Sequence, residues 1–526
     1  MKHLLKLLLF FLIFSFYWNI GENIQNRTEA EDIYEYALMI ENGNDHEWFY
    51  HKHHIAFGPL ICSVNEVLRS FNIIISPLKL MRLVSALSAT GTLIIFYLFC
   101  YKRYCLRPIS SALATISFGM MYGFCRYAGE AEIPIIATFC MIASIFILTS
   151  QKLSLKLFII GTLLSILSVL MHVMNTVAVF IAIPLFFILT KKFKVLIIHI
   201  VINFFVIFMV YDHLLDISEI LRNPVKFREN FDFGIFVKAT IGFFQALISF
   251  DFVLGLSNFR IFLSDLFSNR MLSEEFYFGE RLSITHIIFS SITFVILLII
   301  TLYAVLRSIK IWNNSKIEKT ILLPIEGRKA FILPVVFFIG YSFLLLLIEP
   351  GNPELWVMGL MPFSLLLCGL VFVPLTYDNK LWIPFLAVLI LAIHNNMAIS
   401  VLDDPSKDYN IQKSKYILSI ADSNDLIITA GNPVFERHLR YHSDAKIIYL
   451  YSLPFGSYEQ YDNDFDKKNI YVLGDVFEQI PSMIERFENK SEQIKIFSDK
   501  IKNNVTKIND DEFGGLYILN NKEREL

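Results

Sequence analysis

A cluster of carboxylates follows the first apolar stretch of the chain. Residues 28–37 read Thr-Glu-Ala-Glu-Asp-Ile-Tyr-Glu-Tyr-Ala, and residues 21–60 hold eight carboxylates, two Lys or Arg and four His. Desolvation beside an apolar phase raises the pKa of a carboxyl group toward neutrality, which suits a general base. Helical spacing places Asp32, Glu35 and Tyr36 on one face, which makes Tyr36 a candidate binding residue, while Glu31 points about 100° away. We therefore predict Asp32 as a catalytic base, with Glu31 as the second candidate; a solvated acidic loop is the alternative.

A run of histidines lies in the same region, at His51, His53 and His54. Imidazole is a common metal ligand, but this spacing in a loop is typical of no particular metal site. We predict that His53 and His54 contact substrate or lipid head groups. The sequence requires no metal, although a divalent cation is compatible with it.

Two further polar segments carry candidate binding residues. The first contains Arg126, which can bind a lipid phosphate or snorkel at the interface. The second reads Glu-Pro-Gly-Asn-Pro-Glu-Leu-Trp over 349–356, and it combines residue types that recognise sugar hydroxyls and ring faces. A Trp at the interface and an ordinary turn explain it equally well. The candidate binding residues in the two segments are Arg126, Tyr127, Glu130, Glu132, Glu349, Asn352, Glu354 and Trp356.

The composition shows what must position these residues. Hydrophobic residues make up 55% of the 526 positions, charged residues 18%, and there are 50 Phe. A water-soluble protein of this size could not bury so much apolar surface, and a disordered chain would lack it. The net charge of -2 indicates no nucleic-acid partner, and six Cys are too few for a disulfide scaffold. A multi-pass α-helical membrane protein remains.

Eleven segments are long and apolar enough to be membrane-span candidates, at about 20 residues each. They are 4–20, 81–101, 109–125, 133–150, 157–171, 173–190, 195–211, 284–306, 330–348, 356–376 and 382–401. The first could be a signal peptide, but no small-residue cleavage site follows it, so we favour an uncleaved helix.

Basic residues in the short loops orient these spans. Lys and Arg gather at 102–107, 152–156, 191–194, 307–329 and 380. The positive-inside rule places these loops and the N-terminus in the cytoplasm. The other loops, above all 21–80 and 212–283, then lie outside. Two moderately apolar segments, 55–75 and 234–256, must not cross and are expected along the outer leaflet.

The composition changes at residue 403, which divides the chain into 1–402 and 403–526. The tail holds 16 Lys and Arg and 22 Asp and Glu. Buried strands are predicted at 425–431, 446–451, 469–474 and 516–519, with helices at 432–441 and 482–497. This alternation predicts a small, mostly parallel α/β domain. The orientation of the spans places this domain outside the cytoplasm. Gly431 and Gly474 each follow a strand, where a phosphate could bind or the chain could simply turn.

The layout resembles the GT-C membrane glycosyltransferases, specifically the protein mannosyltransferase and aminoarabinose-transferase-like group. Glu31-Asp32-Ile33-Tyr34 falls where that family has an Asp-Glu-x-x-Tyr type sequence, with the order of the two acids reversed. The segment 54–60 resembles its His-Pro-Leu-Tyr-Pro-like segment without the first Pro. The segments 80–87 and 126–132 resemble its Arg-Leu start of the second span and its Ser-Arg-x-Ala-x-x-Glu region. The similarity to the family's motifs covers residues 1–210 well. The rest of the chain shares only the family's arrangement of spans and domains.

The resemblance implies sugar transfer from a polyprenyl-phosphate donor to a lipid, glycan or protein acceptor at the outer membrane face. Asp32 would take the acceptor proton, the anomeric carbon would invert, and Arg126 would stabilise the leaving phosphate. No cofactor is implied. Composition suggests a bacterial inner membrane. Two alternatives stay open: a lipid or glycan transporter or flippase, which would show mid-span charges or repeats, and a non-catalytic membrane scaffold presenting the tail.

Overall fold

The computed structural model describes residues 2–25, 32–43, 46, 48–130, 132–215, 233–266, 273–317, 323, 325–453 and 469–520. Contacts divide the chain into two compact units. The membrane unit comprises Met1–Ile24, Met39–Phe252 and Ser283–Asp403. The α/β unit comprises Gln25–Leu38, Val253–Leu282 and Asp404–Leu526.

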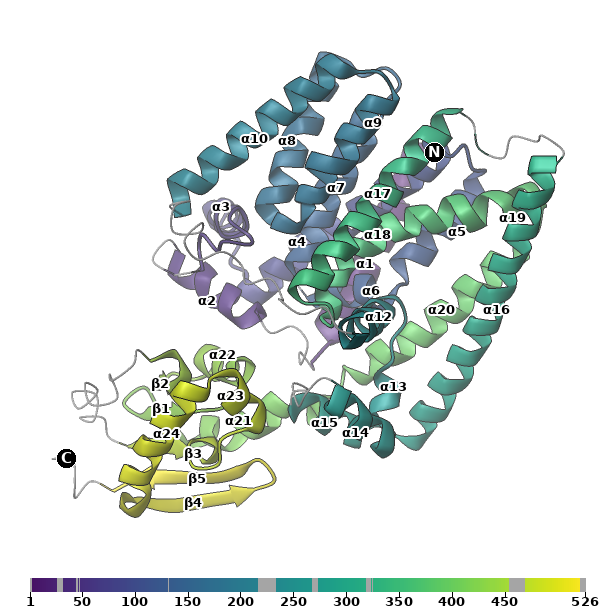
Figure 1. Cartoon of the computed structure of the whole chain (residues 1–526). Coiled ribbons are helices and arrows are strands. Elements are labelled where there is room, and N and C mark those ends of the chain that lie inside the picture. The colour runs from purple at the N-terminus through teal and green to yellow at the C-terminus, as the bar shows by residue number, and fades with distance from the viewer. Residues whose placement is uncertain are drawn as a thin grey trace. The chain divides into compact units, whose positions relative to one another are not determined.

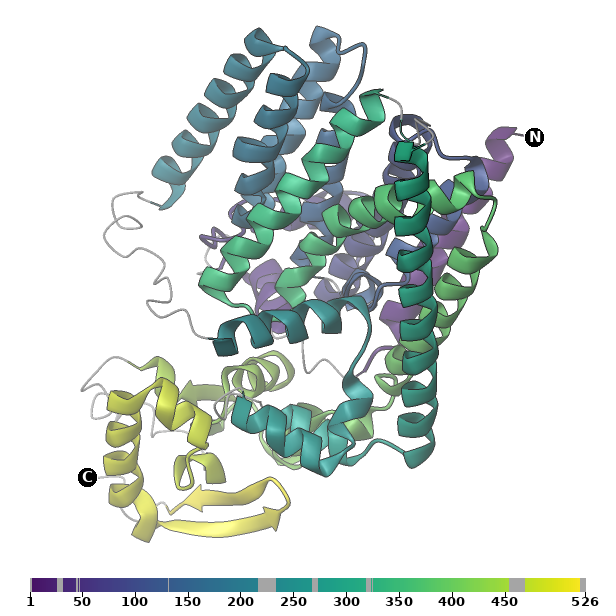
Figure 2. The ribbon, with the colours of Figure 1, turned by 45° about the vertical axis from the view of Figure 1, so that its right-hand side comes forward.

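Six helical stretches of the described residues are long and apolar enough to cross a membrane. They are α4 (Pro77–Arg103), α10 (Phe193–Leu215), α16 (Ile284–Ile317), α17 (Ile325–Ile348), α20 (Trp382–Val401) and the continuous run of α18 (Pro353–Leu367), η4 (Cys368–Phe372) and α19 (Val373–Tyr377). Helices α16 and α20 lie side by side (Figure 2). The chain is therefore a multi-pass membrane protein, as its composition predicts.

The expected number of eleven spans is not confirmed. Over the described residues, the other apolar helices do not meet the same criteria of length and hydropathy, although α6 and α7 become a seventh candidate if the pair, bent by 112°, counts as one. These helices are α1 (Lys2–Asn23), α5 (Pro108–Gly119), α6 (Tyr122–Glu130), α7 (Ile133–Leu148), α8 (Leu155–Met171), η2 (Val173–Asn175), η3 (Ala178–Ala182), α9 (Ile183–Leu189) and α12 (Phe233–Leu247).

The prediction of one span over 109–125 is wrong, because the helix breaks after Gly119. Two side chains from distant helices bind the backbone there. Tyr17 Oη donates to Gly119 O at 2.9 Å, and Asn395 Nδ2 donates to Met120 O at 2.7 Å. These bonds satisfy the carbonyls that an unbroken helix would pair internally. The outer loop expected at 126–132 is also wrong over 126–130, since these residues complete α6.

Helices occupy both segments expected on the membrane surface. They are α3 (Phe57–Ser70) in the first segment, and α12 with α13 (Asp251–Leu254) in the second. None of the three meets the length and hydropathy of a span. Their position along a leaflet stays a prediction.

The α/β unit contains a five-stranded sheet in the order β2-β1-β3-β5-β4 (Figure 1). The strands are β1 (Leu426–Thr429), β2 (Lys446–Tyr449), β3 (Ile470–Leu473), β4 (Val505–Asp511) and β5 (Gly514–Leu519). β2, β1 and β3 are parallel, whereas β5 and β4 run antiparallel. The small α/β domain is confirmed, but its sheet is mixed. Strand β4 was missed because its residues are mostly polar and exposed.

Helices cover both faces of this sheet. Alternation along β1 sends Leu426 and Ile428 into one core and Ile427 into the other. The first core packs against α23 (Pro481–Arg486) and α24 (Glu488–Ile501), which replace the single helix expected over 482–497. The second packs against α21 (Tyr409–Ile420) and α22 (Pro433–His442). The remaining elements are α2 (Ile33–Asn42), α14 (Ser257–Leu266), α15 (Ser273–Glu280), η5 (Pro405–Lys407), η6 (Leu450–Ser452), η8 (Gly474–Val476) and η9 (Lys502–Asn504).

Candidate functional site

The predicted base Asp32 lies against an arginine of the α/β unit. Arg437 Nη1, on α22, forms an ion pair and hydrogen bond with Asp32 Oδ1 across 405 positions of sequence. The same guanidinium places Nε 4.0 Å from Glu35 Oε2, one helical turn further along α2. One arginine therefore contacts two carboxylates of the acidic segment 28–37. Nothing in the sequence pairs residue 437 with the first loop.

A second arginine strengthens this contact. Arg440 Nη1 donates to Glu35 Oε1 at 3.1 Å, and Arg440 Nε donates to Glu436 at 2.9 Å. Burial raises the pKa of Glu436, while Arg440 opposes that shift. Charge-assisted bonds between a guanidinium and carboxylates are among the stronger and more directional polar contacts. The arginines thus fix both Asp32 and Glu35.

Aromatic rings add an apolar component to the same contact. The ring centroid of Tyr34 lies 5.2 Å from His438, 5.4 Å from Tyr441 and 5.3 Å from His442. Tyr34 is buried. Ring contacts at these distances contribute about 0.5–1.5 kcal/mol beyond simple area burial. We call the set of Asp32, Tyr34 and Glu35 with Arg437, His438, Arg440, Tyr441 and His442 the α2–α22 contact.

The local sequence explains why α22 presents these residues. Asn432 caps the helix, since its Oδ1 accepts from Phe435 N at 2.8 Å, and Pro433 occupies the first turn. Phe435 and Leu439 enter the core under the sheet. Arg437 and Arg440 are three residues apart, so they share another face of the helix.

Accessibility separates the two carboxylates that Arg437 contacts. The side chain of Asp32 is 34% exposed, whereas that of Glu35 is 3% exposed. Asp32 is therefore accessible to a substrate, whereas Glu35 is buried within the α2–α22 contact. Tyr36, a predicted binding residue, is buried. Glu31, the second candidate for the base, lies outside the described residues.

The predicted histidines form a cluster in the membrane unit. His54 stacks with His51 at 5.2 Å between centroids and lies 4.8 Å from His172. His53 is 5.3 Å from His51. Burial and then the neighbouring imidazoles hold the pKa of His54 well below its ordinary value, and they lower that of His172 to about 3. The His172 imidazole is consequently neutral near pH 7.

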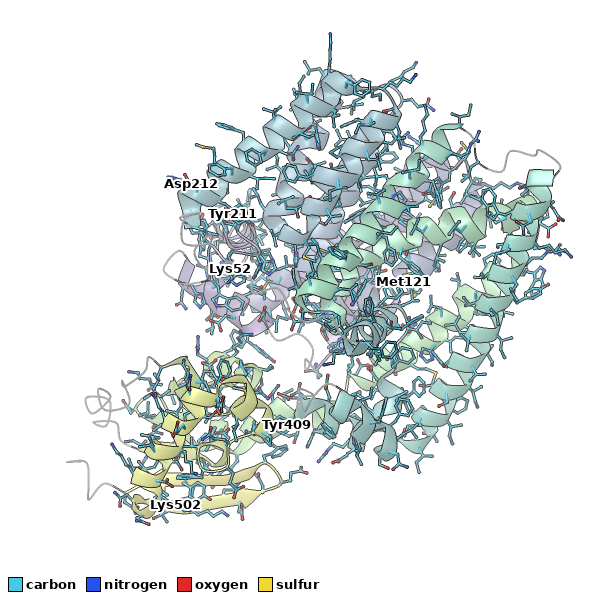
Figure 3. The ribbon with its side chains drawn as sticks, in the orientation of Figure 1. Lys52, Met121, Tyr211, Asp212, Tyr409 and Lys502 are labelled. Carbon is cyan, nitrogen blue, oxygen red and sulfur yellow. The ribbon has the colours of Figure 1, made fainter. Side chains whose placement is uncertain are left out.

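Neighbouring elements support this cluster. His54 Nδ1 lies 3.3 Å from Met171 O, and Val173 N donates to His53 O at 3.2 Å. Tyr211 lies next to Lys52 (Figure 3), and its hydroxyl donates to Lys52 O at 3.2 Å. Among the described residues no group of three or more His, Cys, Asp or Glu could hold a metal ion.

Arg126 and Glu130 form a buried ion pair within α6. Arg126 Nε donates to Glu130 Oε1 at 3.0 Å, with the two side chains 2% and 0% exposed. Arg126 Nη1 also donates to Tyr122 Oη at 3.0 Å. Tyr122 Oη in turn donates to Asp251 Oδ2 at 2.8 Å. The arginine expected at the membrane surface thus belongs to an interior polar network.

The remaining candidates of this segment are buried nearby. Tyr127 lies on α6, and Glu132 immediately precedes α7. Glu132 O accepts a hydrogen bond from Ser85 Oγ at 3.4 Å, which ties the start of α7 to α4. Helix α6 also packs against α12 and α18, the helix that carries Trp356.

The segment 349–356 forms the turn into α18. Asn352 caps the helix by accepting from Glu354 N at 2.9 Å. Trp356 Nε1 donates to Pro350 O at 2.9 Å, and its ring lies 5.2 Å from Phe243. Because Trp356 is 4% exposed, its ring has little surface left for a sugar. Glu349 is exposed and Glu354 half-buried, so these two carboxylates remain accessible.

The carboxyl edge of the parallel strands is filled by side chains. Asp475, after β3, accepts from Ala430 N at 2.9 Å and from Lys413 Nζ at 3.0 Å. Burial lowers the pKa of Lys413, but Asp475, Tyr409 and Glu274 together raise it, and the net shift is upward. A Cβ on Gly431 would meet Asp475 Oδ2 at 2.8 Å. The turn after β1 is therefore packed against a carboxylate and leaves little space for a phosphate.

Glu274 on α15 lies beside this edge. Asn432 Nδ2 donates to its Oε1, and its Oε2 has no hydrogen-bond partner in the described part of the chain. Burial raises the pKa of Glu274 to about 7. The carboxyl group is thus poised between its neutral and ionised forms near physiological pH.

The structure separates the predicted site residues into four groups. Asp32 and Tyr36 lie in the α/β unit, with Arg437 and Arg440, which the sequence did not indicate. The other three groups lie in the membrane unit: the histidines, the α6 residues with Glu132, and the turn before α18. The last two groups are joined by the packing of α6 on α18.

Comparison with solved structures finds whole-chain similarity. ArnT from Cupriavidus metallidurans bound to undecaprenyl phosphate superposes with a TM-score of 0.50 and 8% identity, covering 97% of each chain. Its apo state gives 0.50 and 9% identity, covering 98% of each chain. The archaeal oligosaccharyltransferase AglB from Archaeoglobus fulgidus covers 98% of this chain and 74% of its own at 11% identity and a TM-score of 0.45. No protein-family model and no curated protein matches. The similarity to the two ArnT structures shows that the chain has a GT-C-like fold, as the sequence motifs predict.

Proposed function

We propose that this chain is a GT-C-type glycosyltransferase. It transfers a sugar from a polyprenyl-phosphate-linked donor to a lipid, glycan or protein acceptor at the outer face of the membrane. The observation that carries the proposal is the whole-chain similarity to ArnT in its complex with undecaprenyl phosphate. The order of motifs in the first 210 residues supports it as well, because it resembles the order of motifs in the GT-C family.

The reaction is a single displacement at the anomeric carbon. The acceptor hydroxyl forms the new bond to this carbon while the bond to the phosphate oxygen breaks, and the configuration inverts. Asp32 takes the acceptor proton, and polyprenyl phosphate leaves. The accessibility of Asp32, against the burial of Glu35, favours Asp32 as this base.

Arg126 stays the proposed cation for the leaving phosphate, with a constraint from its surroundings. Its guanidinium already binds Glu130 and Tyr122 in the interior. A buried guanidinium acts on a developing charge more strongly than an exposed one, because the local dielectric is low. The role therefore requires the phosphate to approach α6 itself.

The test is a transfer assay on the full chain in lipid nanodiscs with a panel of polyprenyl-phosphate sugars. Release of polyprenyl phosphate is the readout. We expect Asp32→Asn to lower turnover by about 100-fold or more, the usual contribution of general base catalysis. Glu512→Gln, in the same unit and 57% exposed, is the matched control and should keep wild-type turnover.

Two outcomes would overturn parts of the proposal. Full activity in Asp32→Asn, Glu31→Gln and their double variant would exclude a carboxylate base in this segment. Movement of labelled lipid across vesicles with no covalent product, using folded wild-type protein, would instead establish a transporter.

A further inference from the structure

Helix α22 holds the acidic segment of the first loop through several contacts at once. Arg437 binds Asp32 Oδ1, Arg440 binds Glu35 Oε1 at 3.1 Å, and Tyr34 packs among the three aromatic rings of α22. All of these residues belong to one compact unit. The acidic segment is thus part of the same folded body as the C-terminal sheet.

The arginines differ in what they reach. Arg440 contacts two buried carboxylates, Glu35 at 3% and Glu436 at 4% side-chain exposure. Arg437 spans from Glu35 to Asp32, which is 34% exposed. Glu35 therefore anchors the segment from inside, while the other end of the Arg437 guanidinium fixes the accessible carboxylate.

We propose that Arg437 and Arg440 are positioning residues, which orient Asp32 for proton transfer through a guanidinium bridge from the C-terminal α/β unit. The inference rests on the proposed function, since it assigns the arginines a purpose in that reaction. A guanidinium presents its donors in a rigid planar arrangement, so it fixes both the direction and the ionised form of a carboxylate. The catalytic residue is still Asp32, because among Asp32, Arg437 and Arg440 only Asp32 would touch the substrate.

This arrangement gives the α/β unit a role in the chemistry. Misplacement of a reacting group by about 1 Å can cost about 100-fold in rate. Asp32 immediately precedes α2, and Arg437 forms an ion pair and hydrogen bond with its Oδ1. Removing Arg437 should therefore lower kcat by about tenfold or more. KM should stay within about threefold, because Arg437 itself does not bind the substrate.

The experiment combines kinetics with hydrogen exchange on the full chain in nanodiscs. We expect Arg437→Gln to lower kcat as stated and to speed amide exchange over Ile33–Leu38. Arg437→Lys should recover part of kcat, since a point charge retains attraction but loses the planar geometry. Arg281→Gln is the matched control. It removes an ion pair with Glu512 of 2.7 Å in the same unit and should change neither readout.

A charge-exchange variant distinguishes the binding of the acidic segment by α22 from proton transfer by Asp32. The double variant Asp32→Arg/Arg437→Asp should bring exchange over Ile33–Leu38 back toward the wild-type rate while turnover stays lost, because the base is gone. Recovery of turnover in this double variant would overturn the assignment.

Two further outcomes count against the inference. Unchanged exchange over Ile33–Leu38 in both Arg437→Gln and Arg440→Gln would show that α22 does not hold the segment. Faster exchange with wild-type kcat would show that the contact holds the segment without serving the reaction. If the wild-type chain turns over no donor, the proposed function fails, and the exchange measurement still decides whether α22 holds the segment.

Discussion

Arg126 Nε lies 3.0 Å from Glu130 Oε1, one turn apart on α6, with both side chains almost fully buried. Breaking a buried ion pair from one side leaves an uncompensated charge and costs about 3–5 kcal/mol. Arg126→Gln should therefore reduce folded yield and lower the apparent unfolding temperature in detergent.

The double variant Arg126→Gln/Glu130→Gln should recover part of that stability, because neither charge is left alone. Arg107→Gln, which removes an exposed contact to Asn379, serves as the mild control. An Arg126→Gln protein as stable as the wild type would contradict this prediction.

The crossing of α1 and α6 depends on two glycines. A Cβ on Gly129 would lie 2.9 Å from Gly21 N and 2.9 Å from Ile20 Cγ2. Backbone atoms cannot rotate away, so Gly129→Ala must move one helix and should cost about 1–3 kcal/mol. Thermal unfolding of the full chain would measure this loss. Gly359→Ala, whose Cβ meets only side-chain atoms, the nearest being Tyr341 Cδ1 at 3.2 Å, should be milder. Equal stability of the two variants would refute the argument.

Glu274 should make the stability of the α/β unit depend on pH. Burial raises its pKa from 4.5 to about 7, so the folded state holds a proton that the unfolded chain releases. The stabilisation is complete below about pH 4.5 and is lost as the pH rises through about 7, on the order of 3 kcal/mol in total.

The neutral variant Glu274→Gln removes this titration. The unfolding temperature of the wild type, measured relative to that of Glu274→Gln, should therefore fall as the pH rises from 4.5 to 7. It should be constant above about pH 8. A difference independent of pH between 4.5 and 8 would show that Glu274 does not titrate in this range.

Asn395 of α20 binds three backbone groups. Its Nδ2 donates to Met120 O at 2.7 Å and to Leu247 O at 3.3 Å, and its Oδ1 accepts from Ser249 N at 3.2 Å. Asn395→Ala should cost about 1–3 kcal/mol for each buried group left without a partner. Ser400→Ala, at an exposed position on the same helix, should be neutral. Thermal unfolding would compare them, and matched temperatures would exclude a role for Asn395 in the break after α5.

The sequence predicts the class of this fold because length and composition determine it. Apolar runs of sufficient length mark six spans, and the alternating pattern after residue 403 predicts the α/β tail. The break at Gly119 escapes such reasoning, since the groups that satisfy its carbonyls come from Tyr17 and Asn395, far away in sequence. A run of apolar residues predicts a span by its hydropathy, but it does not indicate hydrogen bonds from residues far away in the sequence.

The residues of the candidate site also fall into some that the sequence predicts and others that it does not. Asp32 could be singled out because acidic residues gather after the first apolar segment. Arg437 could not, because an arginine on a short helix is usually solvated. The one local signal is the pair of arginines three residues apart on the face of α22 that does not enter the core. Nothing in that spacing indicates residues 32 and 35 as partners.

The α/β unit is built from Gln25–Leu38, Val253–Leu282 and Asp404–Leu526, and this has a consequence for biosynthesis. A ribosome adds about 5–20 residues per second, so Arg437 is made roughly 20–80 s after Asp32, 405 positions earlier. Throughout that interval the acidic segment exists without the arginines that contact it in the folded unit. A nascent chain cut short before α22 would therefore carry the proposed base without its partners on that helix.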